Sequence, residues 1–199
     1  MNYCTLSFIK ILLILIHVID EASATIETPS NPPSNTPWTN VALHKPTTQS
    51  STGWGGVASR AVDENTNPYW SNQSLTHTNS ESNPWWEVDL QFIYTIQSVS
   101  VRNRADCCSQ RLNNFILELS TTYDGVSYSY QHNGAVGAGE NVIIETGFVH
   151  ASTIRIRLEG AERILTLAEV EANGCSSFEM PSIQPTRLPS LYPSKSPND

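Results

Sequence analysis

A strict two-residue alternation of apolar and polar side chains constrains the fold of this chain more than any other feature. It is unbroken in TIRIRL, residues 153–158, and it recurs in FILELS, residues 115–120, and around Val99 and Val101. Successive side chains of a β-strand point to opposite faces, so this period indicates strands with one buried face. Turn-rich segments such as DENTNP separate these stretches, and no long helical period is present. The sequence therefore predicts an all-β protein, an antiparallel β-sandwich or jelly roll.

The first residues are typical of a secretory leader. Lys10 precedes the apolar run 11–16, and the small residues ASA at 22–24 stand where a signal peptidase would cut. A membrane anchor is the alternative, but the run is short and is followed by His17 and Asp20. We therefore predict a signal peptide over residues 1–24 and a secreted, extracellular protein.

Two Pro-, Ser- and Thr-rich segments border the predicted domain. Residues 25–37 contain too few apolar side chains to fold and are predicted to be a linker. In residues 176–199 Pro recurs beside Ser or Thr, which predicts a disordered tail. A glycosylated tether to a cell wall or matrix is an alternative for this tail. Between them, residues 38–175 make one domain of about 140 residues, a normal size for a single core.

The net charge of the chain limits its partners. A formal charge of -8 argues against nucleic acid, and against an anionic membrane surface, as the general partner.

The stretch RADCCSQR, Arg104 to Arg111, places two adjacent cysteines between two arginines. Adjacent Cα atoms lie about 3.8 Å apart, so a bond between Cys107 and Cys108 would close a tight ring, and strained backbone often marks a functional site. Removal of the leader would leave Cys175 as the only other cysteine, so one thiol would remain unpaired. Unlinked thiols are the alternative. Guanidinium groups suit oxygen-rich ligands, although two isolated arginines could also be solvated charges at strand ends.

The order and spacing of these residues resemble the F-type lectins, the fucose-binding family of eel agglutinin. That family carries a His followed some two dozen residues later by R-G-D-C-C-x-E-R, and this chain has His77 and then RADCCSQR at a matching spacing. The resemblance extends to NVALHKPTTQSS at 40–51, AVDENTN at 61–67, NPWWEVDL at 83–90 and LAEVEA at 167–172. It implies a discoidin-like jelly roll that binds fucosylated glycans.

The resemblance also implies a role for each residue of the motif. His77, Arg104 and Arg111 would hold the ring oxygen and hydroxyls of α-L-fucose, and the Cys107–Cys108 bond would pack against a carbon edge of the sugar. Asp106 would orient an arginine.

Aromatic residues near the motif have more than one interpretation. Trp70 would lie against the methyl group of fucose, with ordinary packing as an equal alternative. Trp85 and Trp86 open a predicted strand and are expected to be buried in the core.

A calcium ion is implied by the same resemblance. The ligand positions of the family fall on side chains and main-chain carbonyls that offer hard oxygen atoms, as Ca²⁺ requires. They are Asp63, Asn65, Ser74 and Glu169, with the carbonyls of Arg60 and Ala168. Without the resemblance, DENTN at 63–67 has the composition of an ordinary turn.

The chain departs from the family at several positions. Two cysteines that are paired in several relatives would fall at Leu75 and Ala168, so that brace of the calcium loop is absent. Ala105 replaces the Gly of the motif and Gln110 its Glu, which puts the support of one arginine in doubt. Asn72 heads a glycosylation sequon, NQS, beside the predicted site.

Two other function classes compete with a lectin. A glycosidase generally needs two opposed carboxylates, and the predicted site offers a His and two arginines instead, so we predict no enzymatic activity. A discoidin-like adhesion module that binds other glycans, phospholipid or matrix protein is the alternative function. The sequence leaves a homo-oligomer open.

Overall fold

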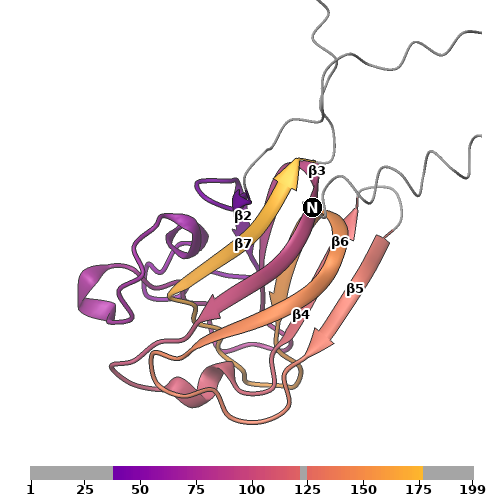
Figure 1. Cartoon of the computed structure of the whole chain (residues 1–199). Coiled ribbons are helices and arrows are strands. Elements are labelled where there is room, and N and C mark those ends of the chain that lie inside the picture. Colours follow the sequence, from indigo (N-terminus) through magenta and orange to yellow (C-terminus); the bar gives the residue numbers. More distant parts are fainter. Residues whose placement is uncertain (1–37, 122–124, 177–199) are drawn as a thin grey trace, which may run out of the picture.

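The computed structural model describes residues 38–121 and 125–176, and within them the protein is built almost entirely of antiparallel strands (Figure 1). The predicted leader, linker and tail lie outside these residues, apart from the boundary residue Ser176. The strands are β1 (Thr39–Asn40), β2 (Thr47–Gln49), β3 (Trp85–Arg102), β4 (Ile116–Thr121), β5 (Gly125–Gln131), β6 (Asn141–Arg157) and β7 (Glu169–Ser176). Three 3-10 turns complete the described elements: η1 (Ala58–Val62), η2 (Trp70–Asn72) and η3 (Ser109–Leu112).

The strands pair in the order β1-β7-β3-β6-β4-β5, and β2 pairs with the first part of β3. Strands β3 and β6 are 18 and 17 residues long, and their register shifts between Asp89 and Tyr94 and again between Ile96 and Ser98. Such bulges bend a strand, which allows one long strand to take part in both layers of a sandwich. The predicted antiparallel jelly-roll sandwich is confirmed, and the segment around Val99 and Val101 is the second half of β3.

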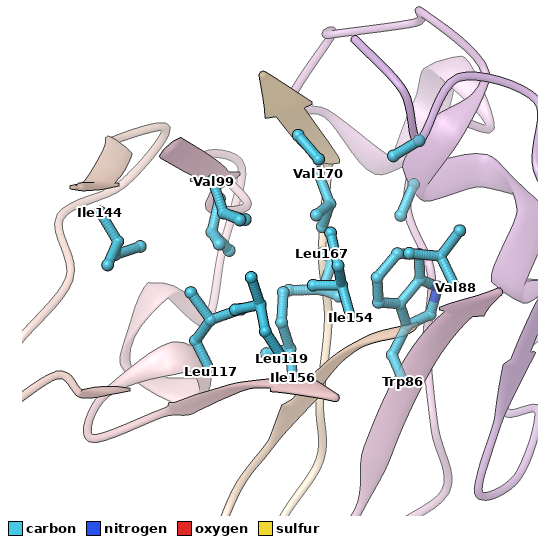
Figure 2. Close-up of a cluster of buried hydrophobic side chains, with 14 of the residues drawn as sticks. Trp86, Val88, Val99, Leu117, Leu119, Ile144, Ile154, Ile156, Leu167 and Val170 are labelled. Atoms are coloured by element: carbon cyan, nitrogen blue, oxygen red, sulfur yellow. The ribbon is translucent and has the colours of Figure 1, made fainter. Parts of the chain in front are cut away.

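Alternating side chains of the long strands meet in one core (Figure 2). Leu117 and Leu119 of β4 and Ile154 and Ile156 of β6 are completely buried, as the alternation predicted. Trp86 is also buried, and its indole N–H donates to the carbonyl of Ala58 at 2.9 Å. Trp85 is only partly buried and lies under the guanidinium of Arg155, 4.6 Å from its ring centroid. The expectation of core burial therefore holds for one tryptophan of the pair and is wrong for the other.

The strand register brings three loops to one edge of the sheet: the loop after β3, the loop before β6 and the loop before β7. Arg102, the last residue of β3, pairs with Asn141 at the start of β6 and with Glu169 at the start of β7. In Figure 1, η3 lies at this lower edge, whereas β7 ends at the upper edge. No helix in the two described ranges is long and apolar enough to cross a membrane.

Candidate functional site

The motif RADCCSQR leaves the edge of the sheet directly after β3, and a buried asparagine anchors it. The amide of Asn103 donates to the carbonyls of Ser109, Val136 and Gly137 at 3.0 to 3.1 Å, and its oxygen accepts the N–H of Arg104 at 2.8 Å. Asn103 is completely buried, so these bonds fix the loop against the body of the domain. An asparagine at a strand end is the only signal for this role in the sequence.

Arg104 is held in a fixed orientation by Asp106. Its Nε and Nη2 donate to the two carboxylate oxygens of Asp106 at 2.5 and 3.1 Å, which is a bidentate pair. The same carboxylate accepts the main-chain N–H of Cys107 and of Trp70. The hydrogen bond from Arg104 is the largest cause that lowers the pKa of Asp106, so Asp106 is a carboxylate at neutral pH. Asp106 therefore fixes the orientation of the Arg104 guanidinium.

The adjacent cysteines form the predicted disulfide. Cys108 has a φ of 59° and immediately precedes η3, so the ring turns the chain into the helical turn that carries Arg111. Cys107 is exposed and Cys108 is partly buried. Cys175 is buried in β7 and is disulfide-bonded in the full-length chain, whereas the expectation of an unpaired thiol concerns the chain after removal of residues 1–24.

Arg111 reaches across to His77, which comes from a different loop. Nη1 of Arg111 lies 3.2 Å from Nε2 of His77, and Nδ1 of His77 lies 2.6 Å from the carbonyl oxygen of Thr78. A guanidinium can only donate, so Nε2 is the acceptor, and the ring proton is on Nδ1, which donates to Thr78. Burial, with further contributions from the charges of Arg111 and Arg104, lowers the pKa of His77, and the imidazole is neutral at pH 7.

The two arginines differ in their ion pairing. Arg104 is 8 % exposed and is neutralised by Asp106, whereas no carboxylate in the described part of the chain lies within ion-pair distance of Arg111. Burial, and secondarily the charge of Arg104, lowers the pKa of Arg111. Its other guanidinium N–H groups can therefore donate to a ligand with oxygen acceptors.

Trp70, in η2, contacts both His77 and Arg104. Its ring lies edge-on to His77 at 5.6 Å, and the guanidinium of Arg104 lies 5.4 Å from its centroid. Trp70 is partly buried, so it packs against the site and also keeps an exposed portion. Both interpretations of Trp70 are compatible with this position.

Hydrogen bonds to residues 165–167, just before β7, fix the segment that carries His77. Thr76 N–H donates to the carbonyl of Leu167, and Thr76 Oγ1 accepts the N–H of Leu167, both at 2.9 Å. Thr78 makes the same pair of bonds with Leu165, at 3.0 and 2.9 Å. These bonds join the segments that contain Leu75 and Ala168, and both of these residues are completely buried.

The predicted calcium ligands lie on the same side of the domain. Arg60 lies in η1, Asp63 caps that turn, and Ala168 directly precedes Glu169, the first residue of β7. Glu169 is 2 % exposed, one oxygen accepts the N–H of Glu64 at 3.2 Å, and Oε2 has no hydrogen-bond partner. Burial, with repulsion from Asp63 and other carboxylates as a smaller cause, raises the pKa of Glu169 to about 7.

Two other predicted ligands are engaged within their own loop. Asn65 donates its main-chain N–H to Asp63 at 2.9 Å, and Ser74 is buried with its hydroxyl donating to the carbonyl of Asn67. No group of three or more His, Cys, Asp or Glu side chains in the described ranges could hold a metal. A cation here would therefore need amide, hydroxyl and carbonyl oxygens besides the two carboxylates.

Comparison with known proteins gives consistent results. A family model described as NedA-like, galactose-binding domain matches residues 60–158. No curated protein matches the sequence.

Among solved structures, a Streptococcus pneumoniae fucose binding module is 34% identical, with a TM-score of 0.64 over 67% of this chain and 96% of that one. The lectin domain of lectinolysin, complexed with Lewis B antigen, is also 34% identical, with a TM-score of 0.64 over 67% of this chain and 94% of that one. An F-lectin (fucolectin) from the serum of striped bass, Morone saxatilis, is 34% identical, with a TM-score of 0.64 over 69% of this chain and 49% of that one.

Proposed function

The chain belongs to the F-type lectin family of discoidin-like domains, and we propose that it is a secreted lectin that binds terminal α-L-fucose through His77, Arg104 and Arg111. The domain is a carbohydrate-binding module and not an enzyme, in line with the lectins and binding modules it matches. The fucose binding modules and the lectin domain complexed with Lewis B antigen support fucose as the sugar.

The single observation that carries the proposal is the contact between Arg111 and the neutral imidazole of His77. It joins two loops that are 34 residues apart in sequence and leaves guanidinium donors of Arg111 available to sugar oxygens. Arg104, fixed by Asp106, adds a second planar donor of known orientation. Hydrogen bonds from charged donors to hydroxyls are the strong polar contacts of such a site.

The apolar contacts complete the proposed site. The Cys107–Cys108 ring is partly exposed beside Arg111 and would cover a carbon edge of the pyranose. Trp70 lies against His77 and Arg104 and would contact the methyl group of fucose. Because sugars present both hydroxyls and C–H groups, a site that offers both kinds of surface can fix the orientation of the ring.

A calcium ion forms part of the proposal. The carboxylate of Glu169 is buried, one of its oxygens is unpartnered, and Asp63 is a like-charged neighbour, which is a costly arrangement without a cation. Asp63, Asn65, Ser74 and Glu169, with the carbonyls of Arg60 and Ala168, offer only oxygen atoms and so fit Ca²⁺. When bound, the ion would neutralise the carboxylates of Asp63 and Glu169, which belong to the loop after η1 and to the start of β7.

Isothermal titration with methyl α-L-fucoside tests the sugar site, with methyl β-D-galactoside as the competing ligand. Arg104→Ala and Arg111→Ala should each weaken fucoside binding by about 1.5 to 3 kcal/mol, the usual value of a hydrogen bond to a charged group. Arg155→Ala is the matched control, because Arg155 pairs with Glu87 and lies over Trp85, outside the site. Full affinity in both site variants would contradict the assignment.

A further inference from the structure

The turn η2 carries a glycosylation sequon that the proposed sugar site does not use. The pattern N-x-S/T occurs once in the sequence, as NQS at residues 72–74. Asn72 is exposed, and so are its neighbours Ser71 and Gln73. An oligosaccharide on the carboxamide nitrogen of Asn72 would therefore extend into solvent and not into the core.

Ser74, the third residue of the sequon, indicates when such a glycan would be added. It is completely buried, and its hydroxyl donates to the carbonyl of Asn67. Gln73, between the two sequon residues, has a φ of 54°, so the folded chain turns sharply there. An enzyme that recognises both Asn72 and the Ser74 hydroxyl can reach them only before the domain folds, as is the case while a secreted chain is being translocated.

Tyr69 and Asn72 are the first and last residues of one hydrogen-bonded turn. The N–H of Asn72 donates to the carbonyl of Tyr69 at 3.1 Å. In such a turn the two Cα atoms lie less than about 7 Å apart, and side chains three residues apart on a 3-10 turn lie on the same side. Asn67 holds the pair together, because its carboxamide oxygen accepts the main-chain N–H of Tyr69 at 3.1 Å and a side-chain N–H of Asn72 at 3.2 Å.

The side chain of Asn72 has room for a sugar in this arrangement. Its Nδ2 also lies 3.4 Å from Oγ of Ser71, a long contact that attachment of a sugar could replace while the bond to Asn67 remains. Tyr69 is 49 % exposed, so its ring offers apolar surface beside the attachment point. The ring of Trp70, by contrast, lies against His77 and Arg104, so the glycan and the proposed fucose site have different neighbours on η2.

We propose that Asn72 carries an N-linked glycan whose first N-acetylglucosamine stacks on the ring of Tyr69, an inference that rests on the secretion included in the proposed function. The C–H face of a pyranose is apolar, and contact with an exposed aromatic ring removes both surfaces from water. The turn already holds the two side chains side by side, so little conformational freedom is lost when they make contact. The glycan therefore stabilises the folded loop around η2.

The first experiment tests whether the site is occupied. The full chain, with its own residues 1–24, is produced in a eukaryotic host that N-glycosylates secreted proteins, and the mass of the protein in the medium is measured before and after peptide N-glycosidase F. The enzyme should lower the mass of the native protein and leave that of Asn72→Gln unchanged. Asn79→Gln is the matched control, because Asn79 is exposed but heads no sequon, and it should keep the glycan.

The second experiment tests the contact with Tyr69. Glycans kept in the high-mannose form are either trimmed by endoglycosidase H to one N-acetylglucosamine or removed completely, and the two products are melted. The trimmed protein should melt about 3 °C higher, the shift that roughly 40 Å² of apolar contact gives in a domain of this size. Tyr69→Ala should abolish that difference, whereas Phe92→Ala, another exposed aromatic at 68 %, should preserve it.

The possible outcomes are distinct. A secreted protein with the bare polypeptide mass, or a glycan that persists in Asn72→Gln, would overturn the site, and an equal melting difference in Tyr69→Ala would overturn the stacking. A chain that stays unmodified inside the cell, but is secreted and glycosylated behind a leader of the host, would contradict secretion and remove the modification from the native protein. A glycosylated chain that does not bind methyl α-L-fucoside would contradict the fucose site alone.

Discussion

Acid should weaken sugar binding through protonation of His77. The neutral ring accepts a hydrogen bond from Arg111 at Nε2 and donates one to Thr78 from Nδ1. A protonated ring cannot accept from Arg111, and its new charge would face both Arg111 and Arg104. Burial, as the largest cause, and these two charges hold the pKa of His77 below its ordinary value of 6.5.

The sign and size of the effect follow from proton linkage. Above about pH 6.5 His77 is neutral in both the folded and unfolded chains, so its contribution to folding stability is fully present there. As pH falls from 6.5 toward the lower pKa of the folded state, the unfolded chain binds the proton first and that contribution is lost. If the sugar needs the neutral ring, the association constant should fall up to tenfold for each pH unit below the folded pKa.

Titration of methyl α-L-fucoside from pH 7.5 to 4.5, with excess calcium, measures this slope. His77→Gln keeps hydrogen-bonding groups but does not titrate, so its profile should be flatter than that of the native protein. The difference between the two profiles isolates His77 from other acid effects, such as loss of calcium from the site that contains Glu169. His44→Gln, at an exposed position, is the control and should titrate like the native protein. Identical profiles for the native protein and His77→Gln would refute the reasoning.

Two further predictions concern the disulfide and the cation. Replacing Cys107 and Cys108 by serine should weaken fucoside binding several-fold, because roughly 40 Å² of apolar contact is lost. The melting temperature should shift by only a few degrees, since a bond between neighbours closes almost no loop in the unfolded chain. Unchanged binding or an unfolded variant would argue against a sugar-stacking ring. Calcium should raise the melting temperature by binding only the folded state, and Glu169→Ala should abolish the shift, whereas Glu171→Ala at an exposed position should not. A melting curve that chelator leaves unchanged would contradict the cation site.

The sequence predicted the strands because their signal is local. Alternation in residues 115–120 and 153–158 requires only neighbouring side chains to choose between core and solvent, and the structure has β4 and β6 at these positions. It did not show that β3 continues for 18 residues or that bulges bend it, because a bulge depends on the partner strand. Trp85 is a different case: it is in phase with Glu87 and Asp89, whereas Trp86 is in phase with Val88 and Leu90, so alternation places only Trp86 on the buried face.

The candidate site also combines features that the local sequence determines with features that depend on tertiary contacts. The adjacent cysteines and the Arg104–Asp106 pair are close in the sequence, so the motif by itself determined that they would meet. The resemblance named His77, but the contact of its Nε2 with Arg111 depends on loops from distant parts of the chain.

Only the tertiary structure decided three other features: the anchoring by Asn103, the threonine bonds that join residues 76–78 to 165–167, and the burial of Ser74 within the sequon. Each of them depends on long-range contacts. The register of β3, β6 and β7 sets where the loops leave the sheet, and that register is fixed by packing of the whole core.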